Sequence, residues 1–433
     1  MISTYHHICP MLMGQVFPHL RLRLSKPAQV ANFLSQNLFS VLASTWPSPR
    51  NHTTPPVSTF ISSPFWPSPS RFMAPSTLPR SSLIPSPLPN SVKELTNSAS
   101  LRSVPPQYAT RNPETTIDIE PIIQEEIPTV DFSLLTEGTP EQRAQVVRHL
   151  GKACEEWGFF MVVNHGIPES LREAMLDSMM EFFDQTEEEK GEYARKHVMN
   201  PIRYGTSFNS TVEDVWYWRD YLRVFVHPVF YSPAKAPPSF REISKEYTTS
   251  TRAMGMELLR GIWESLGLEE NDMTKALDLH SCYQVLVGNI YPPCPQPELA
   301  TGLPAHSDHG LLTILLQNGV NGLQVKHRGN WVRVEPLPNS FLVNTGDHLE
   351  IVSNGRYKSV LHRAEVNSQS TRMSIVTVVA PSLDAIVEPA SQLVSDEHPM
   401  MFGGMRYGEF LERLQANRLK EKSMLDLLRL HAE

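Results

Sequence analysis

The chain has 433 residues, of which 38 are Lys or Arg and 46 are Asp or Glu, so its net charge is −8 at neutral pH. Every acidic residue lies after position 93, against 31 of the basic ones, which gives the body a charge of about −15 and argues against nucleic-acid binding. The sequence contains no run of about 18 apolar residues, which is the length that a membrane-spanning helix needs. Four scattered cysteines without CxxC spacing favour a reducing compartment.

Residues 1–91 are predicted to be a disordered leader. Pro and Ser make up one third of residues 1–93, and so few packing residues cannot bury enough apolar surface to offset the entropy of ordering. The leader has three explanations: an organelle transit peptide, a disordered tail, or an upstream extension of a chain that starts at Met73. We therefore expect a cytoplasmic protein, or a plastid protein if the leader is a genuine transit peptide.

Residues 92–270 are predicted to form a helical region that contains early strands. Thr139-Pro140-Glu141-Gln142 has the residues of a helix start, with Thr139 as cap and Gln142 as its capping-box partner. Residues 157–163 form a buried apolar strand, which the turn at His165 closes. Apolar stripes at helical spacing follow near residues 175–183 and 250–266 and indicate core helices.

Residues 271–433 are predicted to form a double-sheet jelly roll that ends in helices. From about residue 283 the apolar period changes to two, and turn residues separate the following segments. The predicted fold is therefore an all-β core with a helical N-terminal part. The expected strands are 283–291, Leu311–Gln317, Leu323–Lys326, Trp331–Val334, Ser340–Asn344, Ser359–Val366 and Met373–Val379, and the expected C-terminal helices are Tyr407–Leu414 and Ser423–Leu430.

One candidate metal site consists of His306, Asp308 and a later histidine, His362. On an extended strand, side chains at positions i and i+2 share a face, so His306 and Asp308 would point the same way. Two imidazoles and one carboxylate on one face make the triad that holds non-haem Fe(II) and leaves positions open. His309 would be off that face and His348 follows a turn, so we expect both to be surface groups or groups behind the ligands.

Arg372 and Ser374 form a second same-face pair ten residues after the last candidate ligand. A guanidinium can clamp a carboxylate bidentately, and the serine hydroxyl adds a third donor. An open iron beside a carboxylate clamp indicates an oxygenase with an acidic cosubstrate. Tyr291, judged alone, reads as a core tyrosine.

These motifs, together with the stretch that runs from Asn289 and Tyr291 through Pro292-Pro293-Cys294-Pro295, resemble the plant 2-oxoglutarate/Fe(II)-dependent dioxygenases of specialised metabolism. That family includes flavonoid, alkaloid and salicylate hydroxylases, and the resemblance covers roughly residues 92–433. It implies the double-stranded β-helix form of the jelly roll. It also implies a role for each motif residue: Fe(II) ligation by His306, Asp308 and His362, binding of the distal carboxylate of 2-oxoglutarate by Arg372 and Ser374, and completion of the cosubstrate site by Tyr291 and Asn289.

The resemblance further implies the reaction. The enzyme would use O2, with ascorbate as reductant, to hydroxylate a small hydrophobic plant metabolite while releasing succinate and CO2. Desaturation and demethylation stay open as outcomes. Two alternatives also stay open: an ascorbate-dependent non-haem iron oxidase of the same fold, which would retain the Arg-x-Ser pair, and a non-catalytic metabolite-binding jelly roll.

The substrate is predicted from aromatic residues near the barrel mouth. The segment 208–223 is rich in aromatic residues, and Phe208 and Tyr221 are candidate substrate contacts, with Phe341 and Val378 as further residues lining the barrel. Aromatic walls suit a planar molecule, since they offer stacking and apolar burial. The alternative for this segment is ordinary sheet packing around an interior pair of Arg219 and Asp220. We expect a monomer whose partner is a small molecule, without nucleic-acid or membrane partners.

Overall fold

The computed structural model describes residues 91–97, 101–110, 125–194, 196–197, 199–210, 212–416, 419 and 422–430. The leader predicted over residues 1–91 lies outside these ranges, apart from Ser91, which is buried. Among the helices of the described ranges, none combines the length and the apolar character needed to cross a membrane.

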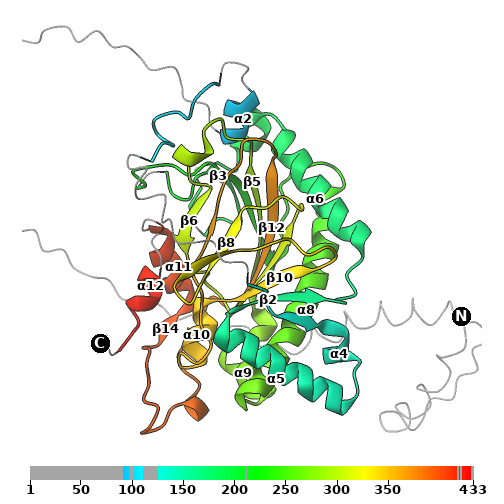
Figure 1. Ribbon diagram of the computed structural model, residues 1–433, viewed down its shortest axis with the longest axis vertical. Helices are drawn as coiled ribbons and strands as arrows, with labels where there is room; N and C mark the ends of the chain where they lie inside the picture. Colours follow the sequence, from blue (N-terminus) through cyan, green and yellow to red (C-terminus); the bar gives the residue numbers. More distant parts are fainter. Residues whose placement is uncertain are drawn as a thin grey trace, which may run out of the picture. The chain divides into compact units, whose positions relative to one another are not determined.

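The larger of two facing sheets carries most of the strands (Figure 1). Its order is β1-β2-β10-β7-β12-β5-β4-β3, and its neighbours pair antiparallel except for the parallel pair of β1 and β2. Its strands are β1 (Thr129–Asp131), β2 (Phe159–Val163), β3 (Ile202–Thr206), β4 (Asp220–His227), β5 (Tyr283–Tyr291), β7 (Leu312–Gln317), β10 (Phe341–Thr345) and β12 (Arg372–Ala380).

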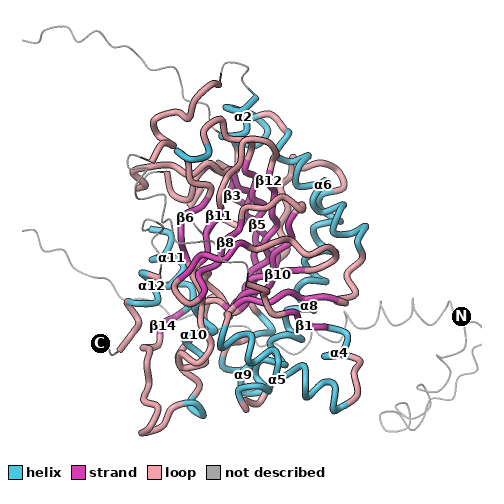
Figure 2. The backbone as a smooth tube through the Cα atoms, viewed as in Figure 1, coloured by secondary structure: helices cyan, strands magenta, loops and turns pink. Residues whose placement is uncertain are grey.

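The smaller sheet has the order β6-β11-β8-β9 and is antiparallel throughout. The tube view shows these strands lying in front of the larger sheet, which makes the two-layer arrangement of a jelly roll (Figure 2). Its strands are β6 (Leu303–His306), β8 (Leu323–His327), β9 (Asn330–Arg333) and β11 (His362–Ala364), and a separate hairpin pairs β13 (Ile386–Val387) with β14 (Met405–Arg406). The jelly-roll prediction is confirmed.

Helices cover the other face of the larger sheet, as the predicted helical N-terminal part requires (Figure 1). Helices α6 and α8 contact β12, and α5 packs on α8. The helices are α2 (Val92–Asn97), α4 (Phe132–Thr136), α5 (Pro140–Glu156), α6 (Glu169–Asp184), α7 (Glu187–Gly191), α8 (Phe240–Leu266), α9 (Glu270–Ala276), α10 (Asp347–Val352), α11 (Tyr407–Ala416) and α12 (Ser423–Asp426), with 3₁₀ turns η2 (Leu279–Ser281), η3 (Pro297–Leu299) and η4 (Ser391–Leu393).

Helix α5 begins where the sequence predicts. The Thr139 hydroxyl accepts a hydrogen bond from the Gln142 N–H at 3.3 Å, and the Gln142 side chain accepts one from the Thr139 N–H at 2.9 Å. The reciprocal bonds satisfy two backbone donors that a helix start otherwise leaves unpaired. Pro140 occupies the first turn, where its missing N–H costs nothing.

Strand β5 separates the apolar core from the site by strict alternation. Leu286 and Ile290 are buried in the core between the sheet and the helices, whereas Asn289 and Tyr291 line a pocket between the sheets. Gly288 faces the helices, and a Cβ at that position would lie 2.2 Å from Sδ of Met179 on α6. Glycine therefore permits the close approach of α6 to the centre of the sheet.

The expected boundary between residues 270 and 271 does not divide the fold. It falls at the start of helix α9, and strands from both sides of it share the larger sheet, where β4 pairs with β5. The described residues, from 91 to 430, belong to one compact unit. The helical region and the jelly roll are thus two layers of one packing unit.

Candidate metal and cosubstrate site

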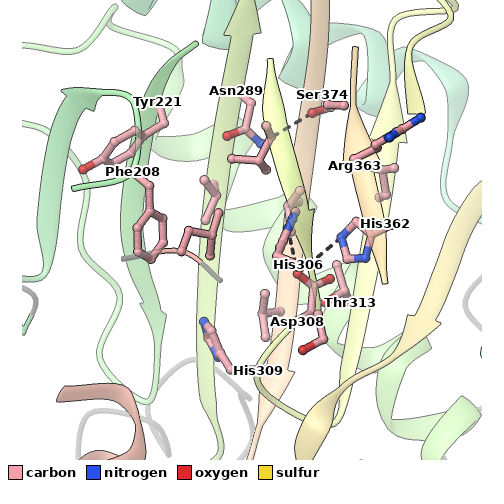
Figure 3. Close-up of a pocket in the computed structure, with 18 of the residues that line it drawn as sticks. Phe208, Tyr221, Asn289, His306, Asp308, His309, Thr313, His362, Arg363 and Ser374 are labelled. Carbon is pink, nitrogen blue, oxygen red and sulfur yellow. Dashed lines mark hydrogen bonds and ion pairs between the residues drawn. The ribbon is translucent and has the colours of Figure 1, made fainter. Parts of the chain in front are cut away.

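His306, Asp308 and His362 converge in the pocket between the two sheets (Figure 3). One ligand atom from each lies within 4.8 Å of the others. His306 and His362 are direct partners across the pair of β6 and β11, and their Nε2 atoms lie 3.7 Å and 3.6 Å from Oδ1 of Asp308. The predicted grouping is confirmed, and within the described residues no other cluster of this kind is found.

The expectation that Asp308 shares an extended strand with His306 is wrong. Strand β6 ends at His306, so Asp308 lies in the following loop and not on an extended strand. The loop is held in place by a hydrogen bond of 2.8 Å from the Asp347 N–H, at the start of α10, to the Asp308 carbonyl. The backbone beyond the strand therefore brings the carboxylate to the histidines.

The two histidines present their Nε2 atoms in a state that can bind a metal. Nδ1 of His306 lies 2.8 Å from the Pro304 carbonyl, and Nδ1 of His362 lies 3.2 Å from the Val360 carbonyl. A carbonyl only accepts hydrogen bonds, so each Nδ1 carries a proton, and Nε2 is the nitrogen through which the neutral imidazole can bind a metal. Burial, and then the neighbouring His362, lowers the pKa of His306, which keeps this imidazole neutral.

Asp308 is held as a carboxylate. Its burial alone would raise the pKa of the carboxyl, but the neighbouring histidines and hydrogen bonds such as that from Asn344 together lower that pKa. The Asn344 side-chain amide donates to Oδ2 of Asp308 at 3.0 Å, which leaves Oδ1 directed at the histidines. Two neutral imidazoles and one charged oxygen are the donor set of the iron triad.

Four polar residues predicted to hold the cosubstrate are brought together by the register of β12 on β5. Arg372 lies directly opposite Tyr291, and Ser374 lies directly opposite Asn289. All four are buried and line the same pocket as the triad. The guanidinium of Arg372 lies 5.1 Å from the centre of the Tyr291 ring, and the Asn289 amide donates to the Ser374 hydroxyl at 3.4 Å.

The pocket end at Arg372 fits an anionic ligand. Burial lowers the pKa of the guanidinium, which nevertheless stays charged because its ordinary pKa is so high. One of its nitrogens donates to the Gln317 side chain at 2.8 Å, but Nε is buried without a partner. Oδ1 of Asn289 is also buried without a partner. Buried polar atoms of this kind favour a ligand that supplies the missing hydrogen bonds.

The surface position considered for His309 and His348 is wrong: His309 lines the pocket beside the triad, and His348 is buried behind it. Nδ1 of His309 lies 2.7 Å from the Tyr407 hydroxyl, and Nδ1 of His348 accepts from the Gly310 N–H at 3.3 Å. Burial lowers the pKa of His309 to about 4 and that of His348 to about 3. Both rings are therefore neutral packing groups against the C-terminal helix α11.

Of the four predicted substrate residues, three line the pocket and one does not. Phe208, Tyr221 and Val378 line the pocket, and Figure 3 shows Phe208 and Tyr221 across the cavity from the triad. The expectation that Phe341 lines the barrel is wrong. It lies on the helix-facing side of β10, fully buried, with its ring edge-on to His165 at 4.7 Å. Asn344, three residues on, takes the opposite face and enters the pocket.

The interior Arg–Asp pair considered for this segment is not formed by Arg219 and Asp220. Asp220 is directed away from the pocket, and its carboxylate accepts the backbone N–H groups of Val92 and Lys93 at 2.9 and 2.8 Å. It thereby fixes the start of helix α2. Arg219, which immediately precedes the strand, instead lines the pocket. The two side chains are thus directed apart, which prevents the pairing.

The pocket mouth is completed by the C-terminal segment. Leu414 of α11 and Met424 of α12 line it. Helix α12 is tied down by Glu350 of α10, a fully buried carboxylate that contacts Nζ of Lys422 at 2.8 Å and a guanidinium nitrogen of Arg429 at 2.9 Å. No residue of this segment was predicted for the site, because its helical pattern carries no sign of where it docks.

Comparisons with known proteins agree with this geometry. A family model of the 2OG-Fe(II) oxygenase superfamily matches residues 282–381, and a model for the non-haem dioxygenase in morphine synthesis N-terminal matches residues 127–243. The two matches correspond to the jelly roll with the triad and to the helical layer with its early strands.

Relatives and solved structures extend the match over most of the described chain. The 2-oxoglutarate-dependent dioxygenase 19 of Oryza sativa subsp. japonica is 53% identical over 304 residues, which cover 70% of this chain and 90% of the relative. Flavanone 3-dioxygenase 2 of the same organism is 41% identical over 307 residues, which cover 70% and 87%. The crystal structure of JOX2 in complex with 2OG, Fe and JA has a TM-score of 0.70 at 31% identity and covers 79% of this chain and 98% of its own.

The chain belongs to the 2OG-Fe(II) oxygenase superfamily. Within it, the protein is a 2-oxoglutarate-dependent dioxygenase that uses Fe(II), 2-oxoglutarate and O2, and it is similar to the plant dioxygenases of specialised metabolism. The prediction drawn from its motifs is confirmed at this level. The comparisons support this function, and not the two alternatives of an ascorbate-dependent oxidase or a non-catalytic binding protein.

Proposed function

We propose that His306, Asp308 and His362 hold the Fe(II) of this dioxygenase. The proposal is supported by the convergence of their ligand atoms and by the two backbone carbonyls that fix the imidazole protons on Nδ1. Bound there with O2, iron supplies the oxidising power for the reaction. The protein's share is to hold the three donors on one side, which leaves the opposite side to cosubstrate and substrate.

Arg372, Ser374, Tyr291 and Asn289 bind 2-oxoglutarate in this proposal. The observation that carries it is the cross-strand register, which sets a buried guanidinium and a hydroxyl opposite a tyrosine and an amide in the pocket of the triad. Arg372 and Ser374 take the distal carboxylate, as a planar guanidinium can bind both of its oxygens. Two buried atoms without a partner, Nε of Arg372 and Oδ1 of Asn289, are available to form hydrogen bonds with the bound cosubstrate.

The substrate class we propose is a small aromatic metabolite, which the enzyme hydroxylates with release of succinate and CO2. Phe208 and Tyr221 form an aromatic wall opposite the triad, and Val378 adds apolar surface. Such walls orient a planar molecule by stacking and exclude water from the reacting carbon. A relative whose name gives an aromatic compound as substrate, flavanone 3-dioxygenase 2, supports this choice.

Succinate release tests the proposal. The enzyme, loaded with Fe(II) and 2-oxoglutarate in the presence of ascorbate, would be screened against phenolic and indolic compounds while succinate and the oxidised product are measured. Aromatic compounds should stimulate succinate release, and the product mass should rise by one oxygen atom. Stimulation by aliphatic compounds alone, or a product that has lost two hydrogens or a methyl group, would contradict the class or the outcome.

We further propose a monomer in the cytoplasm. An acidic body supports solubility without a partner subunit, and gel filtration with light scattering would measure the mass directly. Sequencing the mature N-terminus from the native source would distinguish this location from the plastid. A new N-terminus near residue 90 would favour a transit peptide.

A further inference from the structure

Three arginines share the pocket wall formed by β3 and β4. Arg219, just before the start of β4, and Arg223 on β4 flank Tyr221, and all three line the pocket. Arg203 lies directly opposite Arg223 in the register of β3. Like charges directly opposite each other in a sheet are destabilising. The wall therefore concentrates positive charge on the substrate side of the pocket.

Two of these cations have only neutral hydrogen-bond partners. Arg203 donates to the Gln415 side chain at 2.9 Å, and Arg219 donates to the Ser207 carbonyl at 2.8 Å. Among the ion pairs found in the described part of the chain, none includes either residue, and the nearest acid in sequence, Asp220, faces helix α2. A carbonyl or amide oxygen satisfies one N–H group but does not neutralise the charge.

Arg219 is the more strongly desolvated of the pair. It is 7% exposed, and its Nε is buried without a partner. Its guanidinium lies over the Tyr221 ring at 5.0 Å, on the aromatic wall proposed to hold the substrate. The unpartnered donor thus belongs to a side chain that lies on the aromatic wall, in the pocket that also holds the triad.

We propose that Arg219, assisted by Arg203, binds a carboxylate of the organic substrate, so that the enzyme acts on small aromatic acids in preference to neutral aromatic compounds. This inference rests on the proposed function and names the substrate class more narrowly. A planar carboxylate matches a guanidinium and supplies the negative charge that the pocket wall lacks. The cosubstrate has its own clamp at Arg372, on a different strand.

The test compares aromatic carboxylic acids with their methyl esters. Isothermal titration of the enzyme loaded with Fe(II) and 2-oxoglutarate, without O2, should show acids binding at least about tenfold more tightly than the matched esters. In Arg219→Gln the difference should fall below about twofold, and Arg203→Gln should reduce it in part. Arg219→Lys, which keeps the charge without the fork, should retain an intermediate preference, and the surface variant Arg406→Gln should behave as wild type.

Two results would overturn the inference. One is equal binding of acids and esters by the unmodified enzyme, which needs no variant to fold. The other is a raised KM for 2-oxoglutarate in Arg219→Gln with acid affinity unchanged, which would assign this arginine to the cosubstrate. Succinate release separates the two levels of proposal: stimulation by neutral aromatics but not by acids keeps the proposed function and removes the carboxylate site. Failure of every aromatic compound to stimulate release contradicts the proposed function, while the titration still decides the carboxylate site.

Discussion

The inner end of the pocket and its mouth are built by different means. At the inner end, the metal-binding and cosubstrate groups come mainly from strands in fixed register, with His306 opposite His362 and Arg372 opposite Tyr291. At the mouth, Phe208 and Met424 come from a loop and from a C-terminal helix, which are more than 200 residues apart in the chain. A sheet register allows little freedom, whereas loops and terminal helices accept substitution more readily.

The two regions also differ in charge. At the inner end the carboxylate of Asp308 lies between two imidazoles and is held by an amide. At the mouth, Arg203 and Arg219 have only neutral partners. We infer that the reaction chemistry depends on side chains held by the sheets. The choice among substrates depends on side chains, such as these arginines, that find a charged partner only in the substrate. Four substitutions test this division.

The largest effect is expected from Asp308→Ala. Loss of the only carboxylate in the triad should reduce succinate formation by at least about a thousandfold, or roughly 4 kcal/mol of transition-state stabilisation, because two neutral imidazoles bind Fe(II) weakly. Activity would be measured as succinate release, and folding by thermal melting. Asp384→Ala, which removes an exposed carboxylate paired with Arg406, serves as the matched control and should retain full activity. Wild-type turnover in Asp308→Ala would refute the metal assignment.

Arg372→Lys should raise the KM for 2-oxoglutarate by roughly a hundredfold, or about 3 kcal/mol, because an ammonium cannot make the bidentate contact. Fe(II) affinity should change little, since the triad lies on other elements. Steady-state kinetics at varied 2-oxoglutarate and a chelator competition assay would measure the two effects. A fall in Fe(II) affinity with an unchanged KM would show that the clamp and the metal site are not separate.

Glu350→Gln acts on the mouth. It removes the buried charge that holds Lys422 and Arg429, and it should lower the free energy of unfolding by about 2 kcal/mol, since both cations are partly exposed and can be solvated. The docked position of α12 should loosen, so the KM for the organic substrate should rise while the KM for 2-oxoglutarate stays constant. Urea unfolding and kinetics with both substrates would test this. Equal rises in both KM values would mean that α12 also supports the inner end.

The smallest effect is expected from Ser374→Ala. It removes one neutral hydrogen-bond donor to the cosubstrate, worth about 1 kcal/mol, which corresponds to roughly a fivefold rise in the KM for 2-oxoglutarate. The small side chain leaves almost no cavity, so the melting temperature should be nearly unchanged. An effect as large as that of Arg372→Lys would indicate that the hydroxyl, and not the guanidinium, dominates cosubstrate binding.

The same division explains what could be predicted from the sequence. Strand β5 was predicted with the correct faces because its pocket side carries Asn289 and Tyr291 while its core side is apolar. Strand β10 has no such contrast, since all of its residues are buried, and Phe341 was therefore assigned to the wrong face. The pairing of β12 with β5 is not written in either strand alone, so the opposition of Arg372 and Tyr291 required the fold.

Short and distant elements escaped prediction for related reasons. Helix α10 has only six residues and begins at Asp347. The pair Gly346-Asp347 is typical of a simple turn, so the sequence did not indicate a helix there. Gln317 and Asn344, which support Arg372 and Asp308, carry common amide side chains without a motif. The alternation of faces along β7 and β10 could have assigned Gln317 and Asn344 to the pocket, but only after the metal ligands had been placed.

The assignment of the metal and the cosubstrate to the inner end of the pocket is tested most directly by anaerobic titration of the Fe(II) enzyme with 2-oxoglutarate. The titration is followed by the visible absorption of the Fe(II)–2-oxoglutarate chelate. The wild type should develop this band and saturate. Asp308→Ala should give no band at any concentration, and Arg372→Lys should reach the same final band at roughly a hundredfold higher 2-oxoglutarate. A wild-type band in Asp308→Ala, or a wild-type titration curve in Arg372→Lys, would contradict the assignment of metal and cosubstrate to these residues.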